Sequence, residues 1–417
     1  MRISLPTLGL VAALGGQFLA LGPSAVLAAD RQGVEQPRVR FDAGTSARDI
    51  PFRFELGHII LPVRVADSVA VDMLLDSGLG VNGAILLDPA IGAALDLRYT
   101  GEVPLGGGGP SDPTRAKLAP GVTLSLPGVS FPGQSLLVVT DPEPYRGYPG
   151  RGIIGKTVFD CVVEIDYEKA LIHLYDVNSY HPPEGSTSFA TTSTYGVPVM
   201  DASISTDGST EIPLKLMVDT GAMQLLLFTW ADRSIRPPAD LMAGRERVLS
   251  KGFTGTVLGS TGRIARLQLG PHRLRQVVTA FPDSATWGTA LLLGQQGMLG
   301  NDGLCRFFVT FDYAHNQIHL KPNAQLEKPF ETDMSGMLWE PTADGSLAVI
   351  DVVPDSPAVA GGIEKGDVIV ALDGGSVKEL GWANVERLLM QDGVTVHLTV
   401  LRGAERLEKT IVTRRLI

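Results

Sequence analysis

V-A-V-D-M-L-L-D-S-G (residues 69–78) and I-P-L-K-L-M-V-D-T-G (residues 212–221) are two copies of one pattern. In each, a hydrophobic run ends in Asp and is followed by a hydroxyl residue and Gly. A second motif follows each copy some 80 residues later: R-G-I-I-G (151–155) and Q-G-M-L-G (296–300). The two aspartates lie 143 positions apart and the two final glycines 145, so the spacing indicates duplicated lobes.

The flanking sequence of both copies favours β structure. The repeat continues in V-V-E-I-D-Y-E-K-A-L-I-H-L (162–174) and F-V-T-F-D-Y-A-H-N-Q-I-H-L (308–320), which are alternating and rich in β-branched residues. Such runs, bounded by Gly, Pro and Asp, predict antiparallel strands. Short helices are expected at 87–97, at 228–241 and after each second glycine. The Gly-rich stretches 100–125 and 250–265 predict hairpins.

The repeated Asp predicts a pair of acidic groups. Two carboxyls that share one proton can activate a water: one takes the proton from water while the other donates a hydrogen bond to the attacked carbonyl. Hydroxyl side chains after each Asp can tie the two loops together, and glycines allow tight turns. The candidate residues are the acids Asp76 and Asp219, the supporting Ser77, Gly78, Thr220 and Gly221, and the glycines Gly155 and Gly300 of strands expected beneath each loop.

With these motifs, residues 52–320 resemble the retropepsin and pepsin type of aspartic peptidases. The resemblance implies that Asp76 and Asp219 form a catalytic dyad, and that hairpins near Gly106–Gly109 and Gly252–Gly262 act as flaps. It implies no metal or organic cofactor. The family usually has a small residue after the Gly, as at Ala222, whereas the first copy has Leu79 there.

The character of the sequence changes after about Glu327. G-S-L-A-V-I-D-V-V-P-D-S-P-A (345–358) and G-G-I-E-K-G-D-V-I-V-A-L-D-G (361–374), with a helix expected at 382–390, resemble the PDZ domains of exported bacterial proteases. Such domains bind a peptide as an added strand and capture its terminal carboxylate with loop amides. Ser335, Gly336 and Met337 are the candidate loop. A stabilising or protein-docking appendage is the alternative.

The N-terminal residues and the composition indicate where the protein works. Arg2, the apolar residues 8–21 and the small residues before Ala29 predict a cleaved signal peptide, with an uncleaved anchor as the alternative. Export then predicts a soluble periplasmic or extracellular protein. A net charge of -10 argues against nucleic acid as a partner. The two cysteines, Cys161 and Cys305, allow one disulfide or two free thiols.

Other hydrolytic motifs are absent from the sequence. No Gly-x-Ser-x-Gly or His-Glu-x-x-His pattern occurs, and no metal-binding spacing is found among the histidines. His173 and His319 occupy matching repeat positions and are interpreted as strand residues on a polar face.

The predicted fold is therefore mainly β: two lobes with pseudo-twofold symmetry and a C-terminal α+β PDZ-like domain. The expected division of the chain is a signal peptide at 1–28, an N-terminal extension at 29–50, a first lobe at 51–178, a linker at 179–194, a second lobe at 195–325 and the PDZ-like domain at 330–417. Because one chain carries both Asp loops, we expect a monomeric endopeptidase that acts on polypeptides, with protein C-termini as further partners. The competing hypothesis is a peptide-binding scaffold with an inactive dyad.

Overall fold

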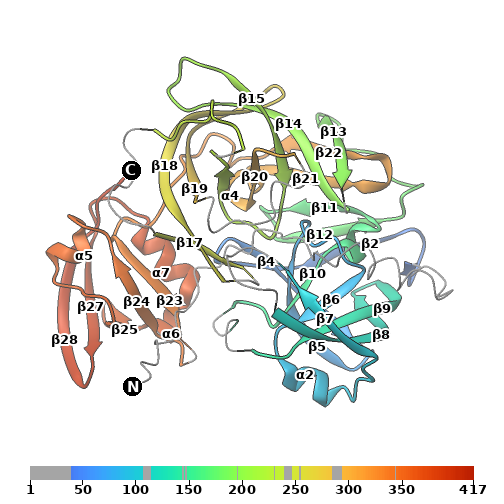
Figure 1. Cartoon of the computed structure of the whole chain (residues 1–417), viewed down its shortest axis with the longest axis horizontal. Coiled ribbons are helices and arrows are strands. Elements are labelled where there is room, and N and C mark those ends of the chain that lie inside the picture. Colours follow the sequence, from blue (N-terminus) through green and yellow to red (C-terminus); the bar gives the residue numbers. More distant parts are fainter. Residues whose placement is uncertain are drawn as a thin grey trace.

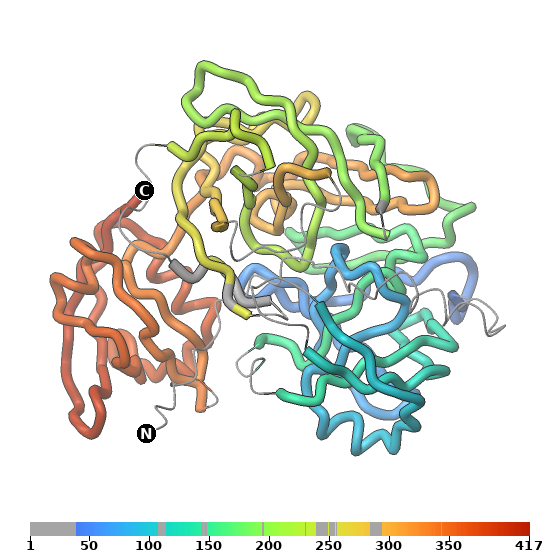
Figure 2. Tube along the Cα trace, in the orientation of Figure 1, coloured from blue at the N-terminus to red at the C-terminus, as the bar shows by residue number. Residues whose placement is uncertain are grey.

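The computed structural model describes residues 39–106, 114–142, 145, 148–194, 196–229, 231–238, 247–252, 255–283, 294–342 and 344–417. The expected signal peptide therefore lies outside the described residues. The chain forms two β lobes and a separate C-terminal unit beside them (Figure 1). Figure 2 traces the chain from the first lobe in blue and teal, through the second lobe in green to orange, to the C-terminal unit in red. The mainly β prediction is confirmed.

The first lobe is built on one sheet whose strand order is β1-β9-β6-β10-β5-β4-β8-β7, with β3 paired to β4. Its strands are β1 (Arg40–Phe41), β3 (Arg53–Glu55), β4 (His58–Val65), β5 (Val69–Leu75), β6 (Gly83–Leu86), β7 (Gly101–Leu105), β8 (Thr114–Leu126), β9 (Val129–Val139) and β10 (Gly152–Ile154). Two short helices, α2 (Pro89–Ala94) and α3 (Lys156–Phe159), lie where the sequence predicts them.

The second lobe repeats this arrangement. Its strands are β14 (Val197–Ser205), β15 (Ile212–Val218), β16 (Leu225–Leu227), β17 (Arg247–Gly252), β18 (Gly255–Leu269), β19 (His272–Pro282) and β20 (Gly297–Leu299), followed by helix α4 (Asn301–Leu304). The helix expected at 228–241 is wrong for residues 228–229 and 231–238, which form turns and irregular structure. Two prolines, Pro237 and Pro238, interrupt that stretch and cannot donate helix hydrogen bonds.

Strand direction differs from the prediction in both lobes. The strand that ends in each Asp is hydrogen-bonded in parallel to the strand of the second motif, β5 to β10 and β15 to β20. In the first pair Leu75 lies opposite Ile154, and in the second Val218 lies opposite Leu299. The second motif thus runs beside the Asp strand and ends at the Asp loop.

A sheet between the lobes joins them, in the order β2-β12-β11-β21-β22-β13. Its strands are β2 (Ser46–Pro51), β11 (Val162–Asp166), β12 (Leu171–Tyr175), β13 (Thr187–Thr194), β21 (Phe307–Asp312) and β22 (Gln317–Pro322). The 3-10 turn η4 (Tyr313–His315) connects β21 to β22. Glu164 and Thr310 occupy the same place in the two copies and pair directly with each other, so a pseudo-twofold axis passes between them.

This sheet incorporates segments that the sequence assigned elsewhere. Residues 187–194 of the expected linker form β13, which pairs with both β22 and β14. Residues 46–51, mostly in the expected N-terminal extension, form β2 against β12. A continuous hydrophobic core runs beneath the sheet and through both lobes, and Phe159 and Phe311 meet in it edge to face, with ring centroids 5.1 Å apart. The lobes are therefore one packed body.

The C-terminal unit has a core of its own, drawn from residues 337–411. Its strands are β23 (Met337–Pro341), β24 (Leu347–Val352), β25 (Val368–Leu372), β26 (Gly375–Ser376), β27 (Thr395–Arg402) and β28 (Glu405–Val412), and its helices are α5 (Pro357–Ala360), α6 (Val377–Leu380) and α7 (Trp382–Leu389). In the part of the chain that the structure describes, strand β23 lies at the edge of this sheet and pairs with β24.

The connection to the C-terminal unit is held against the second lobe. Arg306 donates to the carbonyls of Gln325 and Pro329 and also to those of Leu326 and Lys328. Its guanidinium lies 3.5 Å from the centre of the Phe330 ring, which is buried in the lobe core. The segment at 325–330 is thus part of the second lobe rather than a free tether.

Candidate functional site

The two Asp side chains meet where the lobes join. Each is the first residue after its strand, and each main-chain N–H donates to a carbonyl of the second motif: Asp76 to Ile154 at 2.9 Å and Asp219 to Leu299 at 3.0 Å. Both are buried, with 4% and 0% of their surface exposed. The two carboxyl groups are hydrogen-bonded to each other. Burial, and then the charge of Asp219, raise the pKa of Asp76 well above its usual value.

Reciprocal hydrogen bonds lock the two Asp loops together. The Ser77 N–H donates to Thr220 Oγ1, and the Thr220 N–H donates to Ser77 Oγ, both at 2.9 Å. Each hydroxyl in turn donates to a carbonyl of the other lobe, Ser77 to Val218 at 3.0 Å and Thr220 to Leu75 at 2.8 Å. The hydroxyl positions of the motif therefore do what the sequence analysis expected of them.

The glycines after the hydroxyl residues bring backbone against the carboxyls. The Gly78 N–H donates to Asp76 Oδ1 and the Gly221 N–H to Asp219 Oδ1, both at 2.8 Å. A Cβ placed on Gly221 would lie 2.5 Å from Asp76 Cγ, closer than real atoms approach. This position therefore excludes any side chain so long as the two carboxyls remain in contact.

Gly155 and Gly300 are required because main-chain carbonyl oxygens of the two Asp loops lie directly against them. A Cβ on Gly155 would lie 2.5 Å from the Leu79 carbonyl oxygen and 2.6 Å from that of Asp76. A Cβ on Gly300 would lie 2.6 Å from the carbonyl oxygens of Met223 and Gln224. Both glycines therefore let the second motif turn directly under its Asp loop.

Leu79, the residue that departs from the family pattern, packs into the first lobe. It is 2% exposed and belongs to a hydrophobic cluster with Leu74, Ile85 and Ile153. Ala222 lies in the corresponding cluster of the second lobe with Met217 and Leu226. The larger side chain is accommodated in the core of its own lobe.

Three polar residues near the dyad were missed in the sequence analysis. The Tyr313 hydroxyl donates to the Ser77 carbonyl at 3.0 Å, and the Tyr167 hydroxyl donates to Asn301 Oδ1 at 2.7 Å. Asn301 Nδ2 donates to the Thr220 carbonyl, also at 2.7 Å. The signal was present in the sequence, because Tyr167 and Tyr313 are the repeated Tyr of I-D-Y and F-D-Y.

Two family matches coincide with this geometry. Residues 202–302 match the Aspartyl protease family, a span that contains the second Asp loop and Gly300. Residues 327–413 match the PDZ domain family. The match to the Aspartyl protease family thus lies within the second lobe, and the match to the PDZ domain family covers the C-terminal unit.

Individual proteins resemble parts of the chain. "Putative serine protease HhoA" of Synechocystis sp. is 41% identical over 78 residues, which are 18% of this chain and 19% of that protein. "Serine protease HTRA1" of Xenopus tropicalis is 29% identical over 68 residues, 16% of this chain and 14% of that protein. The chain thus spans less than a fifth of the length of these curated relatives. The crystal structure of an aspartic proteinase from Irpex lacteus covers 68% of this chain and 99% of its own, with 14% identity and a TM-score of 0.46.

Both expected flap regions are flanked by pairs of antiparallel strands. Strands β7 and β8 pair antiparallel up to Leu105 and Thr114, and residues 107–113 between them lie outside the described residues, as does most of Gly106–Gly109. Strands β17 and β18 pair up to Gly252 and Gly255, with 253–254 likewise outside. That these regions act as flaps stays a prediction.

The histidines at matching repeat positions are strand residues with polar neighbours, His173 opposite Glu164 and His319 opposite Thr310, and both are buried. His173 and His319 are 7% and 2% exposed. His173 Nδ1 accepts from the Asp49 N–H at 2.9 Å, and His319 Nδ1 lies 2.8 Å from Ser188 Oγ. His319 Nε2 is buried without a hydrogen-bond partner among the described residues.

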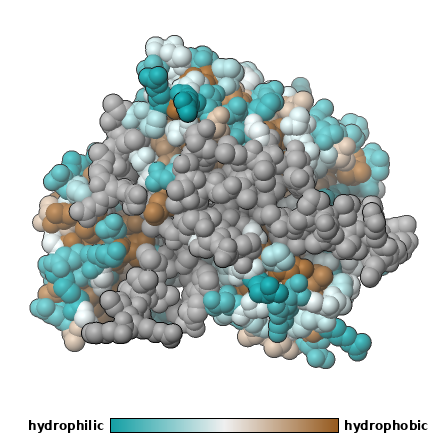
Figure 3. Space-filling model, in the orientation of Figure 1, coloured by the Kyte–Doolittle hydropathy of each residue, from teal (hydrophilic) through white to brown (hydrophobic). Residues whose placement is uncertain are grey.

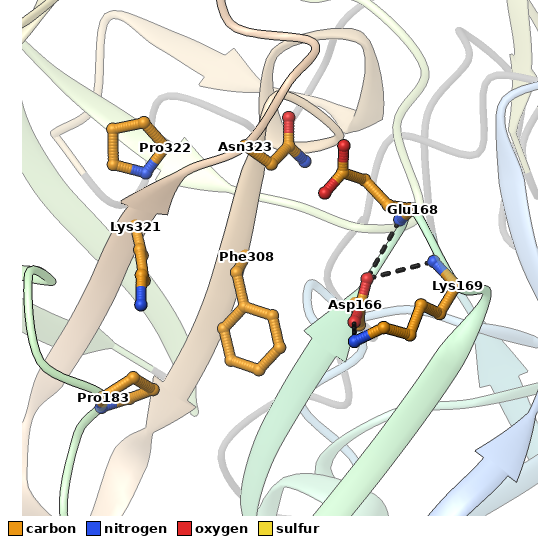
Figure 4. A pocket seen from close by; sticks show the side chains of 8 residues that line it. All are labelled: Asp166, Glu168, Lys169, Pro183, Phe308, Lys321, Pro322 and Asn323. Carbon is orange, nitrogen blue, oxygen red and sulfur yellow. Dashed lines mark hydrogen bonds and ion pairs between the residues drawn. The ribbon is translucent and has the colours of Figure 1, made fainter.

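A further pocket and the possible metal-binding and membrane-spanning features of the described residues give no additional candidate site. A pocket of about 340 Å³ lies beside the sheet between the lobes and is lined by Asp166, Glu168, Lys169, Pro183, Phe308, Lys321, Pro322 and Asn323 (Figure 4). Lys169 is paired with Asp166 there, and Glu168 accepts from the Ala324 N–H. Within the described ranges no group of three or more His, Cys, Asp or Glu has metal-binding geometry, no helix is long and apolar enough to cross a membrane, and both cysteines are free thiols.

The expected carboxylate loop of the PDZ domain is engaged with an internal acid. The N–H groups of Ser335 and Gly336 donate to Asp333 Oδ1 at 2.8 and 3.2 Å, and the Met337 N–H donates to Ser335 Oγ at 3.0 Å. Trp339 Nε1 donates to the other carboxylate oxygen of Asp333 at 3.1 Å. Capture of a free C-terminus by this loop stays a prediction, and it requires Asp333 to move.

Hydrophobic surface is exposed over the PDZ domain in the view of Figure 3. The domain contributes two of the exposed large hydrophobic residues, Val359 and Val412, at 46% and 55% exposure. They lie on α5 and β28, which pack together. Strand β28, which carries Val412, lies at the opposite end of the sheet order from edge strand β23.

Proposed function

We propose that the protein is an exported aspartic endopeptidase in which Asp76 and Asp219 activate a water, and in which the PDZ domain recognises polypeptide substrates or partners. The observation that carries the proposal is the hydrogen-bonded contact of two buried carboxyls from two lobes, whose loops are locked to each other. A structural turn has no need of two buried acids in contact, because like charges in a dry site repel each other.

The chemistry follows from one proton shared by the pair. Burial and mutual repulsion keep one carboxyl protonated while the other ionises, so that the pair titrates as a unit. The ionised carboxyl takes a proton from the attacking water, and the protonated partner donates to the carbonyl oxygen of the peptide bond. The Gly78 and Gly221 amides each hold one oxygen of their carboxyl, which fixes the orientation of both acids.

Substrate recognition rests on β23, which is an edge strand in the sheet order of the described residues and to which an extended peptide can add as a strand. Export rests on the N-terminal sequence alone. It predicts that the mature protein outside the cytoplasm begins near Ala29, which N-terminal sequencing of that protein checks.

A serine-type mechanism is the alternative suggested by the names of the curated relatives. Such a mechanism needs a His that is oriented by a third group and takes the proton of Ser. Ser188 and His319 are in contact, but the other ring nitrogen of His319 has no partner to orient it in the part of the chain described. Ser188 and His319 lie on β13 and β22 of the sheet between the lobes, and neither belongs to an Asp loop.

The test is cleavage of an unfolded, alkylated protein by the purified protein and by two single variants. We expect Asp219→Asn to be inactive and Ser188→Ala to retain wild-type turnover. The opposite pattern would establish serine chemistry. A wild-type protein that binds the unfolded chain in calorimetry but cleaves nothing between pH 3 and 8 would establish the scaffold hypothesis instead.

A further inference from the structure

The two tyrosines of the duplicated strands reach across to the Asp loop of the opposite lobe. Tyr313 follows β21 of the second lobe and contacts Ser77 of the first, whereas Tyr167 follows β11 of the first lobe and contacts Asn301 of the second. Both side chains start from the sheet between the lobes, at equivalent positions on the two sides of the pseudo-twofold axis. The duplication therefore supplies one tyrosine for each Asp.

In the first lobe a single peptide group lies between the tyrosine and the acid. The Tyr313 hydroxyl donates to the Ser77 carbonyl at 3.0 Å. The N–H of the same peptide group, on Gly78, donates to Asp76 Oδ1 at 2.8 Å. A donor at the carbonyl polarises the peptide and makes its N–H a stronger donor.

In the second lobe the corresponding series of hydrogen bonds has one more member, the side chain of Asn301. The Tyr167 hydroxyl donates to Asn301 Oδ1, and Asn301 Nδ2 donates to the Thr220 carbonyl, each at 2.7 Å. The N–H of that peptide group, on Gly221, donates to Asp219 Oδ1 at 2.8 Å. Asn301 Nδ2 also donates to the Gly57 carbonyl at 2.7 Å. Because Nδ2 donates two hydrogen bonds and Oδ1 accepts one, only one orientation of the amide satisfies all three.

Packing holds both tyrosine rings in place. The Tyr313 ring stacks on Phe159 with a centroid distance of 5.1 Å and an interplanar angle of 14°. The Tyr167 ring meets Phe52 and Phe54 edge to face, at 6.1 and 5.6 Å. Asn301 is fully buried. Burial, together with the charges of Asp219 and Asp76, raises the pKa of Tyr313 well above its usual value, so its hydroxyl remains a donor at any pH at which the dyad titrates.

We propose that Tyr313 and Tyr167 are positioning residues for the dyad: each polarises the peptide group that donates to one catalytic carboxyl, Tyr313 directly and Tyr167 through Asn301. The inference rests on the proposed peptidase function for its kinetic consequence only. A stronger N–H donor favours the ionised carboxyl, so the two hydroxyls lower the apparent pKa values of the pair.

The test removes each hydroxyl and keeps the ring, in Tyr313→Phe and Tyr167→Phe of the full chain. Carbon-13 spectra of protein labelled at the Asp carboxyls, assigned with Asp76→Asn and Asp219→Asn, follow the ionisation of the dyad. Weakening a hydrogen bond of about 3 kcal/mol to a charged group by 10–30% predicts upward shifts of about 0.2–0.7 pH unit in the apparent pKa values. Tyr175→Phe is the matched control, since the Tyr175 hydroxyl donates to Glu164 in the same sheet and has no hydrogen bond to the Asp loops among the described residues.

The kinetic readout is the pH dependence of kcat/KM. Both limbs are expected to move to higher pH by the same shift, with KM at the optimum unchanged, because the substrate contacts are untouched. An equal loss of activity at every pH, with the carboxyl titration unmoved, would show a merely structural role and overturn the inference. The Tyr167→Phe variant decides the case should Tyr313→Phe fail to fold.

The two proposals fail separately. If the apparent pKa values of the dyad in both variants stay within 0.1 pH unit of those in the Tyr175→Phe control, the proposed effect of the tyrosines on the acids is overturned, whatever the activity. A wild-type protein without peptidase activity overturns the proposed function, and the carboxyl titration still decides whether the tyrosines act on the acids.

Discussion

Replacing Thr220 by Val removes one of the two hydroxyls that link the Asp loops while keeping the shape of the side chain. Thr220 is fully buried, and its Oγ1 accepts from the Ser77 N–H and donates to the Leu75 carbonyl. Each lost hydrogen bond costs about 1 kcal/mol, and a buried N–H left without an acceptor costs about 1–3 kcal/mol. We therefore expect the free energy of unfolding to fall by about 2–4 kcal/mol.

Urea denaturation followed by circular dichroism measures this loss, with turnover measured on the same preparations. Since the N–H that loses its acceptor lies in the Asp76 loop, we expect kcat to fall by a factor of about 10–100 as that loop shifts. Thr210→Val, in an exposed turn of the same lobe, is the control and should stay within about 0.5 kcal/mol of wild type. A Thr220→Val protein that loses less than about 1 kcal/mol and keeps its turnover would refute the idea that this link positions the dyad.

Three further predictions concern the PDZ junction, pH and oligomeric state. A chain ending at Glu331 should cleave short peptides normally, whereas one ending at Glu327 also loses the buried Phe330 ring and should be destabilised by about 3–5 kcal/mol in thermal unfolding. Burial raises the pKa of Asp302 and of Glu386 to about 7, and the charge of Asp302 also contributes to the rise at Glu386. Each carboxyl binds its proton more tightly in the folded protein than in the unfolded chain, so the free energy of unfolding should fall as pH rises from about 4 to 7. Asp302→Asn and Glu386→Gln should therefore be more stable than wild type at pH 8 and similar to it at pH 4 by urea titration, and equal stability at pH 8 would contradict the pKa values. Specific activity should stay constant on dilution below micromolar, and mixing the two single Asp→Asn variants should restore no cleavage; recovery would show a site assembled between chains.

The fold could be predicted from the sequence because the motifs that determine it are local and occur twice. Each Asp strand and each second motif carries its own hydrophobic run and its glycines, and the equal spacing reveals the duplication. Strand direction could not be read in this way, since β-branched composition does not distinguish the parallel β5–β10 pair from an antiparallel one. The place of residues 187–194 in β13 was also missed, because its pairing with β22 joins strands that are far apart in the chain.

The site was predictable to the extent that identity and spacing define it. Asp76 and Asp219 were brought together as expected. Tyr313 and Asn301 were not foreseen, since their contacts with the Asp loops join distant segments and depend on the sheet between the lobes. The engagement of the PDZ loop by Asp333 was missed for a different reason: an Asp two residues before a turn is common, and only the geometry shows which amides it accepts from.

The central claim is that Asp76 and Asp219 act as one unit on one water, and turnover of the single and double Asp→Asn variants on an unfolded protein tests it most directly. Asn keeps the size of the side chain but cannot ionise, so each single change removes the shared proton. We predict that either single variant loses all measurable turnover and that the double variant loses no more, because groups that act as a unit are not additive. More than a few per cent of wild-type turnover in either single variant, with both proteins folded, would contradict the account.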